Sequence, residues 1–174
     1  MKKVLLVIFS ILIFGCSSSY PNRNITGLNL PQMQGKTLTE QAFSIPDMFT
    51  SKNTLLLIGY KQDSQFDIDR WLIALDMTNT NVTAYEIPAI QGMFPRMFST
   101  VINNGMRAGI PKELWGGVIT LYSDGEKMQM FTGNENENNA RVLLLDQTGK
   151  ILYFYDRGFS VQALKDLRDT LQVS

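Results

Sequence analysis

The sequence predicts an α/β domain in which a mixed central sheet is flanked by helices and preceded by an N-terminal hairpin. Residues 54–60 form a continuous apolar run, typical of a strand buried on both faces. A helical pattern follows this run directly. Two further strand patterns and a last helix then close the chain. This mixture of strand and helix periods indicates one α/β domain.

The first half of the domain follows from local patterns. Apolar residues alternate within residues 36–49, which predicts a small hairpin. Helical spacing predicts a helix over 65–77, with Ser64 and Asp67 as a capping box. A strand over 81–87 comes next. Pro95 then starts another helix, which ends at Gly105 or Gly109.

The second half is predicted to contain two hairpins and a helix. Residues 118–122 and 127–131 have strand patterns around a turn, and the same arrangement returns in 141–145 and 150–155. Between the hairpins lies GNENENN, residues 133–139, which predicts a solvated loop. Its Glu135 and Glu137 leave calcium binding open. Ser160 caps the last helix, whose apolar stripe is Val161, Leu164, Leu167 and Leu171.

The N-terminus has the pattern of an export signal. Lys2 and Lys3 precede an apolar run over 4–14 that is too short to cross a bilayer as a permanent helix. The sequence Ile-Phe-Gly-Cys that ends at Cys16 resembles the lipobox of bacterial lipoproteins. That resemblance implies cleavage between Gly15 and Cys16, acylation of Cys16, and, from the serines that follow, transfer to the outer membrane. The alternative is an uncleaved anchor with an incidental cysteine.

These patterns divide the chain into three parts: a signal peptide over 1–15, a polar tether over 16–35 and a folded domain over 36–174. Prolines and glycines interrupt any periodicity in the tether. The formal net charge is zero, so no nucleic-acid partner is expected. We expect the acyl chains to bind the domain to a membrane, on the periplasmic face of the outer membrane.

The order of elements resembles the thioredoxin fold, and the N-terminal hairpin resembles its peroxiredoxin-type elaboration. The resemblance is carried by GKTLTEQAFSIPDMF before NTLLLIGY, and by ARVLLLDQTGKILYFYDRGFSVQALKDLRDTL at the C-terminus. It covers residues 35–172. The chain is also similar to the mitochondrial ATP synthase assembly factor with this fold and to bacterial lipoprotein relatives. The resemblance therefore implies a thioredoxin-like sandwich.

The resemblance also implies a redox site whose parts are missing here. Proteins of this kind carry a reactive cysteine at the start of the first core helix, where the helix dipole lowers its pKa. Residues 61–66 hold that place without a cysteine, and residues 139–141 lack the family's cis-proline. The single cysteine is Cys16, and the chain has no histidine. Disulfide exchange, peroxidase chemistry and histidine-based triads or metal sites are not expected. No cofactor is implied.

We therefore expect a binding or assembly module of the bacterial envelope with an unidentified protein partner. Arg107 and Trp115 lie in a segment rich in glycine and bulky residues, which favours a partner groove there. Lys61 and Arg70 at the first core helix are further candidates for partner contacts. One alternative is a non-thiol enzyme that uses Lys61, Arg70 and the nearby carboxylates of Asp63 and Asp67. Another is a purely structural lipoprotein. The spacing of Asp63, Asp67 and Asp69 argues against a metal site.

Overall fold

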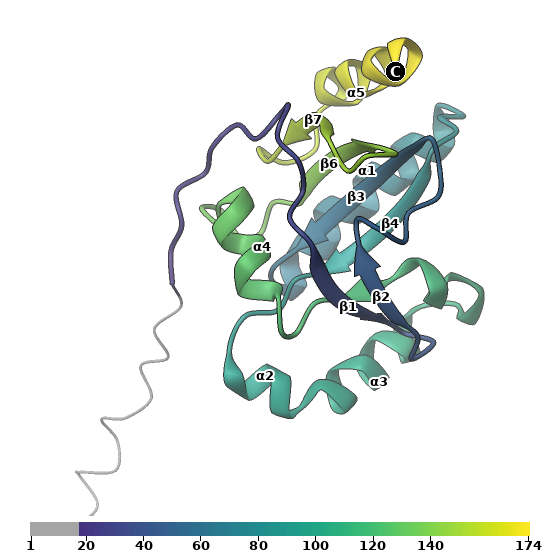
Figure 1. Ribbon diagram of the computed structural model, residues 1–174. Helices are drawn as coiled ribbons and strands as arrows, with labels where there is room; N and C mark the ends of the chain where they lie inside the picture. The colour runs from purple at the N-terminus through teal and green to yellow at the C-terminus, as the bar shows by residue number, and fades with distance from the viewer. Residues whose placement is uncertain (1–17) are drawn as a thin grey trace, which may run out of the picture.

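A four-stranded sheet forms the centre of the computed structural model, which describes residues 18–174 (Figure 1). In spatial order its strands are β4 (Thr83–Pro88), β3 (Asn53–Gly59), β6 (Arg141–Asp146) and β7 (Ile151–Tyr155). The central pair β3 and β4 is parallel, whereas β6 pairs antiparallel with both β3 and β7. The predicted mixed α/β class is confirmed.

A smaller antiparallel sheet extends the central one. Its strands are β2 (Ala42–Ile45), β1 (Met33–Thr37) and β5 (Ile119–Thr120), in that order. Single bridges from Glu86 to Val118 and from Ala89 to Leu121 connect the β5 segment to β4. The predicted N-terminal hairpin is therefore confirmed, and it lies beyond the β4 edge of the central sheet.

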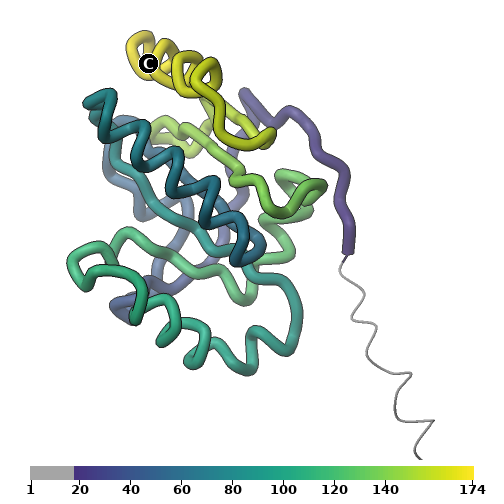
Figure 2. Tube along the Cα trace, turned by 180° about the vertical axis from the view of Figure 1, so that it is seen from behind, coloured from purple at the N-terminus to yellow at the C-terminus, as the bar shows by residue number. Residues whose placement is uncertain are grey.

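Helices cover both faces of the central sheet. One face carries α1 (Gln65–Met77) and α5 (Val161–Val173), which lie toward the viewer in Figure 2. The opposite face carries α4 (Gly125–Thr132) and the segment before β1. The short helices α2 (Met93–Met97) and α3 (Ser99–Gly109) lie at the periphery (Figure 1). Two 3-10 turns, η2 (Gln62–Ser64) and η3 (Lys112–Gly117), complete the elements.

Strand β3 is buried on both faces, which explains its unbroken apolar sequence. Leu55 and Leu57 pack against α1 and α5, in the cluster that contains Trp71. Leu56 and Ile58 point to the other face, because successive side chains of a strand alternate. All four leucine and isoleucine side chains are fully buried.

The helix predicted over 65–77 is confirmed to the residue as α1. The last helix is also confirmed, and Ser160 caps it by accepting a hydrogen bond from the Ala163 N–H at 3.0 Å. The helix predicted from Pro95 begins slightly earlier and is divided into α2 and α3.

The strand predicted over 127–131 is wrong, because these residues belong to helix α4. The alternation of polar and apolar residues there suggested a strand, but the buried side chains Met128, Gln129 and Thr132 have helical spacing. Gly125 starts this helix so close to Ile90 that an added Cβ would collide with the Ile90 backbone. The strand predicted over 118–122 is reduced to β5, which pairs with β1.

The predicted polar tether over 16–35 is also wrong for its described part. Ile25 and Leu30 are buried in the core, and β1 begins at Met33. The backbone N–H of Gly27 donates to the Ile151 carbonyl at 2.8 Å, which fixes this segment beside β7. The predicted signal peptide and Cys16 lie outside the described residues. Within residues 18–174, no helix has the length and apolar character needed to span a bilayer.

Candidate functional site

The junction between β3 and α1 is closed and packed. Ser64 is buried, and its hydroxyl donates to the Lys61 carbonyl at 2.6 Å instead of capping α1. Gly59 makes room for this side chain, because a Cβ at Gly59 would collide with the Ser64 hydroxyl oxygen. Lys61 is exposed and forms an ion pair with Glu137. The predicted capping role of Ser64 is therefore replaced by a turn-closing hydrogen bond.

Asp67 joins α1 to two other segments and does not cap its own helix. Its carboxylate accepts hydrogen bonds from the Ala140 N–H at 2.8 Å and from the Phe159 N–H at 2.6 Å. Only 6% of Asp67 is exposed. Ala140 directly precedes β6, and Phe159 lies just before α5. One buried carboxylate thus satisfies two backbone donors that would otherwise lack partners.

Arg141 is a fully buried cation at the start of β6. Its guanidinium lies 4.7 Å from the centre of the Tyr60 ring, in cation–π geometry. It donates to the carbonyls of Asn136 and Asn139 at 3.0 and 2.8 Å, and also to the Glu135 carbonyl. Burial lowers the pKa of Arg141, but an arginine remains charged. The predicted solvated GNENENN loop is therefore wrapped around a buried guanidinium.

Tyr60 completes this buried polar centre. Burial raises the pKa of its phenol to about 12, although the neighbouring Arg141 charge acts in the opposite direction. Its hydroxyl hydrogen-bonds to Thr132 at the end of α4. The structure thus places β3, α4 and the loop before β6 around one tyrosine and one arginine.

Asn134 connects this loop to the start of the described chain. Its side chain donates to Gln129 at 2.9 Å and to the Ser18 carbonyl at 2.8 Å, and accepts from the Tyr20 N–H. Only 3% of Asn134 is exposed. Asn134 lies in the loop predicted to be solvated, but its side chain is buried and connects that loop to Ser18 and Tyr20.

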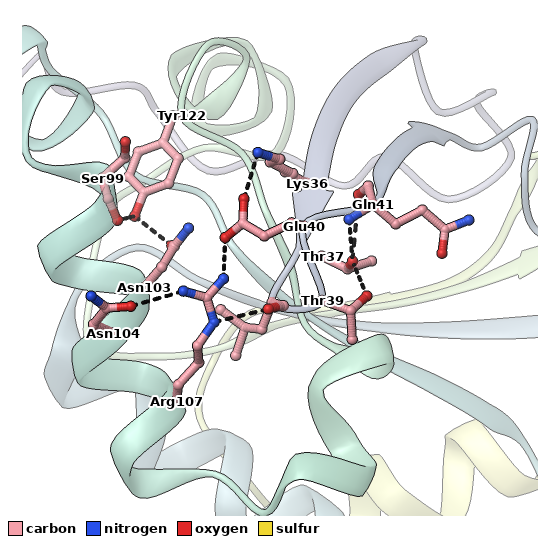
Figure 3. A network of polar contacts seen from close by, with 11 residues as sticks. Lys36, Thr37, Thr39, Glu40, Gln41, Ser99, Asn103, Asn104, Arg107 and Tyr122 are labelled. Atoms are coloured by element: carbon pink, nitrogen blue, oxygen red, sulfur yellow. Dashed lines mark hydrogen bonds and ion pairs between the residues drawn. The ribbon is translucent and has the colours of Figure 1, made fainter.

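Arg107 and Trp115 lie together on the other side of the domain, where Figure 3 shows the polar contacts of Arg107. Arg107 donates to the Leu38 carbonyl and to Asn104, each at 2.9 Å, and forms an ion pair with Glu40. Its guanidinium lies 5.7 Å from the Trp115 ring centre. Both residues therefore hold α3 and η3 against the β1–β2 turn. The other arginine predicted to contact a partner, Arg70, is exposed on α1 and forms no ion pair with another described residue.

Most of these polar groups connect separate segments of the domain. Within residues 18–174, no three histidine, cysteine or carboxylate side chains converge as a metal site would require. Two hollows of about 280 and 400 Å³ lie along β7, and residues 61–66 line neither of them. The candidate residues Lys61, Arg70, Arg107 and Trp115 thus fall on two separate regions, and the structure does not bring them into one site.

Sequence reasoning missed Arg141, Tyr60 and Asn134. Arg141 offered one signal, since it begins an otherwise apolar strand pattern, RVLLL. Buried arginines need several acceptors, and the only nearby supply is the polar loop before the strand. Tyr60 and Asn134 gave no comparable signal.

No family model and no curated protein matches the sequence. Solved structures do match. The thiol peroxidase of Chromobacterium violaceum aligns with a TM-score of 0.57 and 11% identity, over 91% of this chain and 95% of that protein. A SCO1/SenC family lipoprotein from Bacillus anthracis aligns with a TM-score of 0.56 and 12% identity, over 87% of this chain and 98% of that one.

The fold is thioredoxin-like. The exposed lipoprotein thioredoxin Etrx1 of Streptococcus pneumoniae supports the same assignment, with a TM-score of 0.55 and 9% identity over 80% of this chain and 98% of that one. Identities this low carry the fold alone. The thioredoxin-like domain keeps the β3–α1 junction of the fold, and residues 61–66 at that junction contain no thiol.

Proposed function

We propose that this protein is a lipid-anchored bacterial envelope protein whose thioredoxin-like domain binds or assembles a protein partner without redox chemistry. One observation carries the proposal: the β3–α1 junction has Ser64, buried and bonded to its own turn, and no cysteine. A nucleophilic thiolate needs an accessible sulfur at such a helix start. The similarity to two solved structures described as lipoproteins supports an envelope location.

The alternative of a non-thiol enzyme finds less support in the geometry. Both oxygens of Asp67 are occupied by backbone N–H groups, so this carboxylate is not available as a base. Lys61 is paired with Glu137, and Arg70 lies exposed on α1. These residues do not converge on a shared point where a substrate atom could lie.

Absence of redox activity is tested with the purified full chain. We expect no reduction of insulin disulfides and no peroxide consumption above buffer. Cys16→Ser should leave both rates unchanged, because Cys16 is assigned to lipid attachment. Turnover that disappears in Cys16→Ser would contradict the proposal.

Anchoring and partner binding are tested in cells. Radioactive palmitate should label the wild-type chain and not Cys16→Ser. For the partner, a photoreactive residue in place of exposed Leu114, beside Trp115, should give a discrete crosslink identified by mass spectrometry. The same residue in place of Val173, at the far end of α5, is the matched control. Equal crosslinks from both positions would argue against a specific surface.

A further inference from the structure

An exposed apolar patch covers α2 and the first turn of α3. Its side chains are 54–76% exposed, and they are Met93, Phe94, Met97, Phe98 and Val101. Five large apolar side chains in nine residues are far more than scattered surface hydrophobics. We call these five residues the α2–α3 patch.

The patch points outward because the helix is held by its other side. The Tyr122 hydroxyl donates to the Ser99 carbonyl at 3.2 Å and to the Asn103 side chain at 2.9 Å (Figure 3). Asn103 is buried, whereas Met97 and Val101 on the opposite side are exposed. Ile102 and Met106 of α3 are half-buried on the inner side, so this segment carries apolar side chains on both sides, whereas a normal surface helix directs its apolar stripe to the core alone.

The N-terminal end of the described chain is fixed rather than tethered. Asn134 binds the Ser18 carbonyl, and the Asn134 N–H donates to the Tyr20 carbonyl at 2.9 Å. Cys16 is two residues before Ser18 in the sequence, and two residues of chain span at most about 7 Å. Acyl chains on Cys16 would therefore hold the domain directly against the bilayer.

The α2–α3 patch begins beside this attachment point. The Tyr20 hydroxyl and the Gln91 side chain donate to the same Glu126 oxygen, at 2.7 and 3.3 Å. Gln91 is two residues before α2. Figures 1 and 2 both show the described chain starting on the side of the molecule where α2 lies. At about 1.5 Å per helical residue, Met93 to Val101 extends only about 12 Å from there.

The charge of this segment also suits a membrane surface. Residues 87–112 contain no acidic residue, and their basic residues are Arg96, Lys112 and Arg107, of which Arg107 is paired with Glu40. Arg96 is exposed within the patch itself. A basic and apolar helical surface favours the boundary between anionic headgroups and acyl chains.

We infer that the α2–α3 patch is a membrane-docking face, which lies in the headgroup region of the same bilayer that holds Cys16. This inference rests on the proposed acylation of Cys16. It adds an orientation: the β3–α1 junction and α2 face the membrane, and the far end of α1 points away from it.

The test measures the depth of single positions in a reconstituted bilayer. Full-length Phe94→Trp is extracted from the membranes of the expressing bacterium and placed in vesicles of phosphatidylethanolamine and phosphatidylglycerol that carry brominated lipids. Met77→Trp, equally exposed at the distal end of α1, is the matched control, and the wild type gives the background of Trp71 and Trp115. Mass spectrometry of the same samples reports acylation.

We expect quenching of Phe94→Trp by bromines placed about 5–10 Å into the headgroup and acyl boundary, and background quenching of Met77→Trp. Acylated protein in which both positions give background quenching would overturn the inference and leave the anchor intact. Protein without acyl chains would overturn the anchor and the inference together. A dimer that shields position 94 in the absence of vesicles would show that a second copy covers the patch, and would also overturn the inference.

Discussion

At the scale of single residues, the most informative side chain is Asp67, because one carboxylate serves two separate loops. We expect Asp67→Asn to lower the free energy of unfolding by about 2–3 kcal/mol, since an amide can accept from one backbone N–H but presents its own N–H₂ to the other. Chemical denaturation measures this change.

Asp69→Asn is the matched control for that substitution. Asp69 is exposed two residues further along α1, and the one described group that donates to it is the Gln65 side chain. Its replacement should change stability by less than about 0.5 kcal/mol. Equal effects of the two substitutions would contradict the role assigned to Asp67.

The raised pKa of Tyr60 predicts that the free energy of unfolding falls at alkaline pH. Its pKa is about 12 in the fold, whereas an unfolded tyrosine loses its proton near pH 10. A raised pKa in the folded state stabilises the fold. This stabilisation is complete at pH values below the pKa of the unfolded state and is lost as the pH rises toward the pKa of the folded state. The free energy of unfolding should therefore fall between about pH 10 and pH 12, by up to about 1.4 kcal/mol per pH unit for this group.

Tyr60→Phe checks this assignment. Denaturant titrations should show a constant difference from wild type between about pH 7 and pH 9, and a shallower decline above about pH 10. Tyr122, whose pKa burial also raises to about 12, remains in the variant and keeps part of the slope. Parallel curves for wild type and variant over the whole range would exclude Tyr60 as the source.

At the scale of elements, the segment before β1 behaves as part of the core. Ile25 is fully buried among residues of β3, β6 and the N-terminal hairpin. We expect Ile25→Ala to lower the free energy of unfolding by about 2–5 kcal/mol, because a cavity remains between elements that cannot close it.

Leu28 provides the comparison for Ile25. It lies three residues further in the same segment and is 47% exposed, so Leu28→Ala should change stability by less than about 1 kcal/mol. If Ile25→Ala were as mild as Leu28→Ala in thermal and chemical denaturation, the segment would be a tether after all.

At the scale of the whole molecule, the fold is thioredoxin-like and residues 18–174 contain no cysteine. The junction that could expose a nucleophile is closed by Ser64, and the loop opposite is held by Arg141. An exposed apolar patch lies on α2 and the first turn of α3, and Tyr20 and Gln91 connect the N-terminal end of the described chain to the residues before it. Together these features are the basis of the proposed binding role and of the proposed membrane-docking face.

The sequence by itself determined the elements that show in the spacing of apolar residues along a short stretch of chain. The apolar run in β3, the helical spacing of α1 and the Ser160 cap each depend on residues close in the chain, so their predictions were confirmed. The missing thiol at residues 61–66 was likewise visible in the sequence.

Tertiary structure alone decided the features that depend on distant segments. Residues 127–131 became helical because α4 packs against β3 and the N-terminal segment, not because of local periodicity. Asn134 became buried through Ser18 and Tyr20, more than 100 residues away. Regular spacing of apolar residues shows that one face of a helix or strand is buried. Only the tertiary structure shows which segment covers that face and which apolar side chains remain exposed to water.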